Sequence, residues 1–189
     1  MGTLILDMVI SIDAITAAAD GDLGFHDAGG GLGATMADQL RRLRTCDAIL
    51  LGAQTYRLFS EFWPTTTAQD QQIAPFINAT PKHVVSSTLD AAPWGQHEPA
   101  TVERGDGVEV ARRLTRKYAG DVVVWGSITL GESLLAAGAV DALWLRVVPV
   151  LMGAGRPLAT GPLLQAPWHL QSSVAYPGGV LGLVYQRHV

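Results

Sequence analysis

The chain has 189 residues, 48% hydrophobic and 16% charged, a balance that excludes intrinsic disorder and predicts one domain over residues 1–189. Its formal net charge is −4 and its 13 lysines and arginines are mostly scattered, which argues against a nucleic-acid partner. Asp7 and Asp13 interrupt the first apolar run, and no apolar segment reaches the roughly 18–20 residues of a membrane span. We therefore expect a cytoplasmic protein without membrane contact.

Apolar patterns predict strands that alternate with helices over most of the chain. Strands are expected at 3–12, 48–51, 82–86, 100–103, 122–125 and 142–150. Helices are expected at 34–45, from Gly52 to about Phe59, at 71–78, at 107–118 and after Gly126-Ser127. The segments 13–33 and 61–69 have the composition of loops.

The C-terminal segment carries a hairpin signal. Residues 170–176 and 180–187 flank Pro177-Gly178-Gly179, which is a turn sequence. Strands that alternate with helices and then end in an antiparallel pair predict an α/β fold. We expect a mainly parallel central sheet with an antiparallel C-terminal hairpin.

No metal pattern is present in the sequence. The single cysteine, Cys46, excludes an internal disulfide, and a cysteine-based zinc site needs several such ligands. The five histidines lack metal-ligand spacing such as H-x-x-x-H. We expect no metal, and we interpret Cys46 as a small buried residue near a helix–strand junction.

Three predicted strands end in small or hydroxyl-bearing residues, and ligands of open α/β sheets bind at such strand ends. The first two are Gly52-Ala53-Gln54-Thr55 and Ser86-Ser87-Thr88, and the third is Gly126-Ser127-Ile128-Thr129. Gly52 and Gly126 each precede a helix, whose first N–H groups are unpaired and can bind phosphate. The three turns together suggest a dinucleotide site, although ordinary strand–helix turns have the same composition. The G-x-G-x-x-G and G-x-x-x-x-G-K-[ST] fingerprints are absent, which argues against a common Rossmann domain and a P-loop.

Two acids and two tryptophans are candidates for the substrate side. Asp13 follows the first strand and can either bind a polar ring or cap a turn. Asp38, off the apolar stripe of the first helix, can donate a proton or face solvent. Trp63 and Trp125 can stack on a flat heterocycle or simply pack in the core.

Four segments in order resemble a known family: LLGAQTYRLFSEFWP, KHVVSSTL, VVVWGSITLGESLLAAGAVDALWL and VVPVLMGAGRPL. They are similar to the dihydrofolate-reductase-like superfamily, and most of all to the C-terminal domain of the riboflavin-biosynthesis reductases. The resemblance covers nearly the whole chain. It implies a three-layer fold with a central, mostly parallel sheet, NADPH as hydride donor, and a homodimer.

The resemblance also implies roles for individual residues. Gly52 and Thr55 match the family's G-R-x-T-Y turn at a cofactor phosphate, and Ser86, Ser87 and Thr88 match the segment at the 2′-phosphate. Gly126, Ser127, Thr129 and Leu130 match the glycine turn under the pyrophosphate. Pro149, Gly153 and Gly155 match a P-x-x-x-G-x-G segment, and Asp13 matches the acid of an S-x-D-G segment.

The chain departs from the family pattern at two places in these turns. Ala53 stands where members usually have arginine, which removes a guanidinium able to pair with phosphate. Trp125-Gly126-Ser127 stands where the riboflavin reductases often have Glu-Gly-Gly, so the resemblance leaves the substrate open.

Our leading hypothesis is an NADPH-dependent reductase that transfers a hydride to a small heterocycle of pterin or pyrimidine type, with Asp13 or Asp38 as proton relay. One alternative is a nucleotide-binding or regulatory domain that kept the fold and lost turnover. Another is a reductase that uses a flavin-type cofactor.

Overall fold

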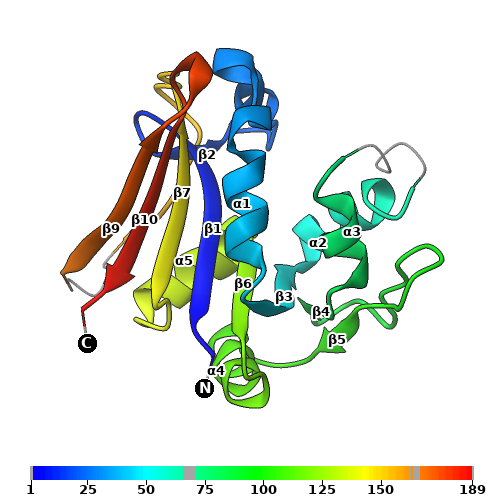
Figure 1. Cartoon of the computed structure of the whole chain (residues 1–189). Helices are drawn as coiled ribbons and strands as arrows, with labels where there is room; N and C mark the ends of the chain where they lie inside the picture. Colours follow the sequence, from blue (N-terminus) through cyan, green and yellow to red (C-terminus); the bar gives the residue numbers. More distant parts are fainter. Residues whose placement is uncertain (1, 66–70, 162, 164–166, 189) are drawn as a thin grey trace.

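The computed structural model describes residues 2–65, 71–161, 163 and 167–188, and a central sheet of eight strands runs through them (Figure 1). The strands are β1 (Leu4–Ser11), β3 (Cys46–Gly52), β4 (Lys82–Val85), β5 (Thr101–Glu103), β6 (Asp121–Trp125), β7 (Ala142–Val148), β9 (Trp168–Ala175) and β10 (Leu181–Arg187). Their order across the sheet is β5-β4-β3-β6-β1-β7-β10-β9. The strands from β5 to β7 are parallel, whereas β10 is antiparallel to both β7 and β9.

Helices cover both faces of the sheet. They are α1 (Met36–Leu43), α2 (Ala53–Phe62), α3 (Ala74–Ala79), α4 (Gly107–Lys117) and α5 (Ile128–Ala136). Leu6 and Val124 point to one face, where they join a buried cluster with residues of α4 and α5. Their neighbours Ile5 and Val123 point to the other face, where the cluster includes residues of α1, α2 and α3. This alternation of side chains produces three layers, helices–sheet–helices, and confirms the predicted α/β fold with its antiparallel hairpin.

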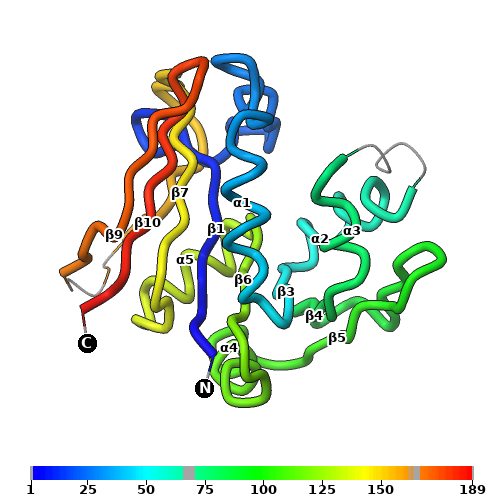
Figure 2. The backbone as a smooth tube through the Cα atoms, viewed as in Figure 1, coloured from blue at the N-terminus to red at the C-terminus, as the bar shows by residue number. Residues whose placement is uncertain are grey.

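The strand order puts the N-terminal strand in the middle of the molecule. Figure 2 shows β1 between β6 and β7, which come more than 100 residues later in the chain. The side chain of Asp7 sits at the centre of β1, opposite Trp125 of β6 and Trp144 of β7. A charged residue at this point is therefore enclosed on both sides by neighbouring strands.

The predicted loop 13–33 is the largest departure from expectation. It contains β2 (Ile15–Ala17) and the short helix η1 (Gly24–Gly30), and the short helix η2 (Gly33–Thr35) begins at its last residue, so α1 starts two residues later than predicted. Strand β2 pairs with β8 (Arg156–Pro157), and the Thr16 hydroxyl donates to the Arg156 carbonyl at 2.7 Å. A partner 140 residues away stabilises this strand, so local composition does not reveal it.

Smaller differences concern the ends of elements. Helix α2 continues to Phe62, α3 begins at Ala74, and β7 ends at Val148, because Pro149 cannot donate to the ladder. Part of the predicted loop 61–69 lies outside the described residues. Cys46 is buried at the start of β3, as expected, and desolvation raises the pKa of its thiol to about 12.

Candidate functional site

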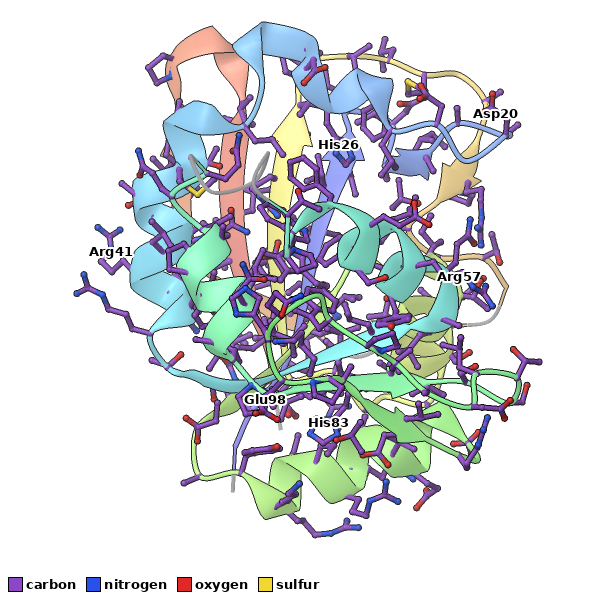
Figure 3. All side chains as sticks on the ribbon, turned by 90° about the vertical axis from the view of Figure 1, so that its right-hand side faces the viewer. Asp20, His26, Arg41, Arg57, His83 and Glu98 are labelled. Atoms are coloured by element: carbon purple, nitrogen blue, oxygen red, sulfur yellow. The ribbon has the colours of Figure 1, made fainter. Side chains whose placement is uncertain are left out.

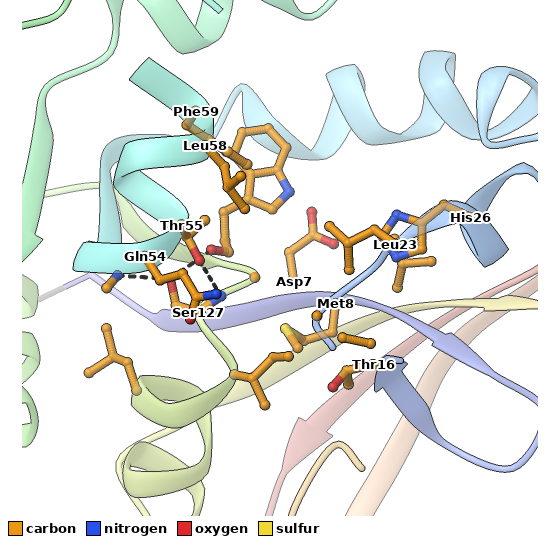
Figure 4. Close-up of a pocket in the computed structure, with 18 of the residues that line it drawn as sticks. Asp7, Met8, Thr16, Leu23, His26, Gln54, Thr55, Leu58, Phe59 and Ser127 are labelled. Carbon is orange, nitrogen blue, oxygen red and sulfur yellow. Dashed lines mark hydrogen bonds between the residues drawn. The ribbon is translucent and has the colours of Figure 1, made fainter. Parts of the chain in front are cut away.

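A cavity of about 480 Å³ opens where β3 and β6 end and extends along β1. Figure 4 shows Gln54, Thr55 and Ser127 on one side of it, and Asp7, Met8, Thr16, Leu23 and His26 on the other. The first side consists of two strand–helix turns. The second side consists of β1, β2 and the segment that contains η1.

The two turns are tied to each other through Ser127. The Gly52 amide donates to the Ser127 hydroxyl at 2.8 Å, and the Ser127 amide donates to the Thr55 hydroxyl at 3.0 Å. The Ser127 hydroxyl in turn donates to the Trp125 carbonyl at 3.0 Å. Gly126 and Ser127 both have left-handed backbone conformations, with φ of 55° and 60°. Glycine adopts this region without penalty, whereas serine pays about 1–2 kcal/mol, which these hydrogen bonds offset.

Helices α2 and α5 both begin at the cavity, and among the described residues neither has a side-chain cap. Their first turns, Ala53–Thr55 and Ile128–Leu130, line it. Helix α4 differs, because Asp106 accepts from the amides of Val108 and Glu109 at 2.9 and 3.0 Å. The unpaired amides of α2 and α5, together with the helix dipoles, form a site suited to anionic oxygens.

The third predicted turn lies beside the first but does not line the cavity. Gly52 pairs with Val85, so Ser86 follows at the same edge of the sheet. The Ser86 hydroxyl accepts from the amides of Thr88 and Leu89 at 3.2 and 3.0 Å, and the Arg104 guanidinium donates to the Ser86 carbonyl at 2.7 Å. Ser87 and Thr88 are exposed.

Three polar side chains from β1, α1 and β7 form a closed cycle in the cavity wall. Arg146 donates to Asp7 Oδ1 at 2.9 Å and to Gln39 Oε1 at 2.8 Å, and Gln39 donates to Asp7 Oδ2 at 3.1 Å. The Asp7 side chain is only 2% exposed and that of Arg146 is 12% exposed. Each charge is therefore compensated within the cycle, as a buried ion pair requires.

His26 of η1 lines the same side of the cavity. Its Nε2 atom is buried and has no hydrogen-bond partner among the described residues. Desolvation, and then the positive charge of Arg146, lower the pKa of His26 to about 4. The ring is consequently neutral at pH 7.

The structure does not bring Asp13 or Asp38 to the cavity. The exposed Asp13 carboxylate accepts from Ser11 Oγ at 2.6 Å and from the amides of Met152 and Gly153 at 3.1 and 2.7 Å. These hydrogen bonds lower the pKa of Asp13 to about 2, and the bond from Ser11 has the largest effect. They join the end of β1 to the turn after β7. Asp13 therefore caps a turn, which is the second of the two roles considered for it. Gly153 takes part through this bond and does not line the cavity.

Asp38 lies on α1 and is engaged at the molecular surface. It accepts from the Tyr176 hydroxyl and from Arg41, and the Tyr176 hydrogen bond is the main cause of its lowered pKa. Figure 3 shows Arg41 extending away from the body of the molecule. The neighbouring Gln39, rather than Asp38, points to the cavity.

Trp63 and Trp125 both line the cavity, together with Phe59. Trp125 is 6% exposed, and its ring centroid lies 6.1 Å from that of Phe59 and 6.4 Å from that of Phe76. The indole is therefore held in place by edge-to-face packing. The cavity thus combines an aromatic wall, two open helix starts and a polar cycle.

Asp7, Gln39, Arg146 and His26 are among the cavity residues that sequence reasoning missed. A signal existed for two of them, because Asp7 interrupts the apolar run LILDMVIS and Arg146 interrupts LWLRVV. A charge inside a buried strand needs a partner. Strand order, which the sequence pattern does not specify, identifies that partner.

Within the described ranges, no group of three or more histidine, cysteine or acidic side chains is placed to hold a metal. No helix in this part of the chain is long and apolar enough to cross a membrane.

The three-layer fold with a cavity at the ends of β3 and β6 is that of the dihydrofolate-reductase-like proteins. A dihydrofolate reductase from Enterococcus faecalis, solved with NADP(H), superposes with a TM-score of 0.62 at 16% identity, over 100% of this chain and 98% of that one. A putative riboflavin biosynthesis protein from Shewanella sp. PV-4 superposes with a TM-score of 0.75 at 18% identity, over 99% of both chains. At these identities the likeness shows the fold.

Residues 2–181 match the model of the RibD C-terminal domain family, and the chain belongs to this family. The curated relative "Uncharacterized protein YyaP" of Bacillus subtilis (strain 168) is 22% identical over 184 residues, which cover 96% of this chain and 93% of the relative. The predicted resemblance is therefore confirmed. Family and fold together indicate a reductase-type protein.

Proposed function

We propose that this protein is an NADPH-dependent reductase that transfers a hydride to a small, flat heterocycle of pterin or pyrimidine type. The observation that carries the proposal is the pair of uncapped helix starts, α2 and α5, that meet at one cavity. Because Ser127 joins the two helix starts, they suit two adjacent phosphate groups better than a single phosphate group.

The residues present fit a dinucleotide that lies across the sheet edge. Ala53–Thr55 and Ile128–Leu130 would hold the pyrophosphate through backbone amides, with Gly52, Gly126 and Ser127 setting the turns. Ser86, Ser87 and Thr88 would face the adenosine end, since β4 is next to β3 in the sheet. The cofactor, when bound, supplies the hydride.

The chain's own contribution is orientation and exclusion of water. Trp63, Trp125 and Phe59 form an apolar wall in which a flat ring can stack. A dry, shaped cavity aligns the reacting partners, and this alignment supplies much of the rate enhancement in hydride transfer. Asp13 and Asp38 are engaged elsewhere, so neither is assigned a proton transfer.

Binding of NADPH tests the proposal most directly. We expect NADPH to raise the Tm and to quench tryptophan fluorescence, because Trp63 and Trp125 line the cavity. Ala53→Glu should weaken this binding at least tenfold. A carboxylate at the first position of α2 suits the helix, but it competes for the amides and repels phosphate.

The matched control is Ala119→Glu, which makes the same charge change at an exposed position before β6, outside the cavity. It should bind NADPH as the unmodified protein does. Equal binding by both variants, or no binding by the unmodified chain at millimolar NADPH, would refute the cofactor assignment.

A second candidate, a nucleotide-binding domain without turnover, is favoured by one observation. Ala53 leaves the start of α2 without the guanidinium usual in the family, so phosphate affinity at this helix start rests on backbone amides, whereas the start of α5 has Arg156 beside it, which donates to the Thr129 hydroxyl at 3.0 Å. Steady oxidation of NADPH in the presence of a reducible pterin or pyrimidine would exclude this candidate.

We also propose that the protein forms a homodimer, as the family resemblance implies. Strand β7 is paired on both edges within the sheet. Contact between two copies would therefore use the sheet face or the outer strand β9. Light scattering after size exclusion measures the mass and decides the point.

A further inference from the structure

We propose that Asp7, Gln39, Arg146 and His26 form the substrate anchor, and that this anchor takes an uncharged ring with an N–H donor beside a carbonyl acceptor, that is, a cyclic amide. The inference rests on the proposed function in treating this side of the cavity as the substrate end. The two can still fail independently, because the anchor is tested without NADPH.

The polar cycle has hydrogen-bonding capacity that it does not use internally. Asp7 accepts one bond at each carboxylate oxygen, and each oxygen can accept another. Arg146 uses two of its five N–H groups in the cycle. The cycle therefore presents an acceptor next to a donor in the cavity wall, 2.9 Å apart.

A cyclic amide has the complementary edge. Its N–H can donate to the Asp7 carboxylate, and its carbonyl can accept from the Arg146 guanidinium. Hydrogen bonds to charged partners are stronger than neutral ones, especially where water is excluded. Gln39 bonds to both charged partners and so fixes their relative position.

The charge of the anchor selects against ions. Asp7 and Arg146 compensate each other, and His26 is neutral at pH 7, so the net charge of the four side chains is zero. A charged ligand would leave one buried charge uncompensated. An uncharged ligand keeps the balance.

His26 supplies the independent indication that a ligand belongs here. Its buried Nε2 atom has no partner among the described residues, and His26 lines this cavity on the same side as Asp7 (Figure 4). A buried polar atom without a partner is costly. A polar substituent on the bound ring would give His26 its missing hydrogen bond.

Three bicyclic probes test the anchor: isocarbostyril, a neutral cyclic amide; its N-methyl derivative, which lacks only the N–H; and quinaldate, an anion of similar size. Binding to the full chain without NADPH is measured by saturation-transfer NMR titration at neutral pH. We expect isocarbostyril to bind at least tenfold more tightly than either of the others.

Asp7→Asn should invert the charge preference. The anchor then carries one uncompensated positive charge, so quinaldate should bind more tightly than to the unmodified chain and isocarbostyril less tightly. His26→Leu should weaken the binding of isocarbostyril several-fold, and the binding of quinaldate should stay weak. Asp38→Asn, next to Gln39 but outside the cavity, is the matched control and should rank the probe affinities as the unmodified chain does.

A variant with altered folding is recognised from its thermal melt. In that case the double variant Asp7→Leu/Arg146→Leu, which has no buried charge, replaces Asp7→Asn and should lose the preference for the cyclic amide. The inference is overturned if the unmodified chain binds the three probes equally or prefers quinaldate. It is also overturned if the Asp7 variants rank the probe affinities as the unmodified chain does. Probe selectivity without NADPH binding would refute the cofactor proposal alone, and NADPH binding without selectivity would refute the anchor alone.

Discussion

The amide nitrogen of Gly52 lies 2.8 Å from the hydroxyl oxygen of Ser127, and this hydrogen bond joins the turn after β3 to the turn after β6. The two residues are 75 positions apart in the chain. Since α2 and α5 begin directly after these turns, the bond sets the relative position of the two helix starts at the cavity.

Replacing Ser127 tests this connection. Ser127→Ala loses the hydroxyl and keeps the left-handed backbone, so we expect a loss of about 1–2 kcal/mol in the free energy of unfolding. Ser127→Gly also loses the hydroxyl but relieves the backbone, and it should be about 1 kcal/mol more stable than the alanine variant. Urea denaturation measures both values. An alanine variant as stable as the glycine variant would contradict the left-handed conformation.

Restoring the family's arginine at position 53 should strengthen cofactor binding. In Ala53→Arg a guanidinium at the start of α2 can pair with a phosphate, so we expect NADPH affinity to rise roughly tenfold. The gain should shrink at high salt, because position 53 at the start of α2 is half-buried and salt can screen the pair there. Fluorescence titration at two salt concentrations measures the effect, with Ala119→Arg as control. If NADPH affinity rises equally in Ala53→Arg and in the control variant, the phosphates bind elsewhere.

The buried pair of Asp7 and Arg146 should be strongly coupled. Asp7→Leu leaves Arg146 buried and uncompensated, and we expect a loss of about 3–5 kcal/mol in stability. The double variant Asp7→Leu/Arg146→Leu should recover at least about 2 kcal/mol of this loss, because no unpaired charge remains. Chemical denaturation of the two single variants and the double variant gives the coupling energy. Additive losses would mean that the two side chains do not interact.

His26 should make stability depend on pH in the acidic range. Desolvation and the charge of Arg146 lower its pKa in the folded chain from 6.5 to about 4. The unfolded chain therefore binds the proton first, so the contribution of neutral His26 is complete above pH 6.5 and is lost as the pH falls toward 4.

His26→Gln removes this titration, and its Tm should fall less steeply than that of the unmodified chain between those two pH values. His97→Gln, at an exposed histidine, is the control and should follow the unmodified chain. Parallel melting curves for all three proteins would show that His26 has its ordinary pKa.

Asp13 should act on stability and not on the chemistry. Its lowered pKa, about 2, means that its contribution is complete above pH 3.8 and is lost as the pH falls through 2. Asp13→Asn should lower the Tm by a few degrees at neutral pH, because the bonds to Ser11, Met152 and Gly153 weaken. NADPH affinity should change less than twofold. A loss of turnover with an unchanged Tm would instead support the proton relay.

Much of the fold was predictable from local patterns. Short apolar runs and helical patterns identified the strands of the main sheet and the helices between them, because each of those elements buries one face or both. The turn at Pro177-Gly178-Gly179 identified the C-terminal hairpin in the same way. The short strand β2 was not predictable, since it exists only through its pairing with β8.

The sequence by itself determined the layer architecture, the family and the three strand-end turns, all of which depend on residues near one another in the chain. Only the tertiary structure decided which side chains meet: it joined Asp7, Gln39 and Arg146, and it engaged Asp13 and Asp38 away from the cavity. The reason is physical. Local patterns report which face of an element is buried, whereas the partner of a buried charge is set by the order of strands across the sheet. That order, with β1 between β6 and β7, brings Asp7 and Arg146 together over 139 positions of the chain.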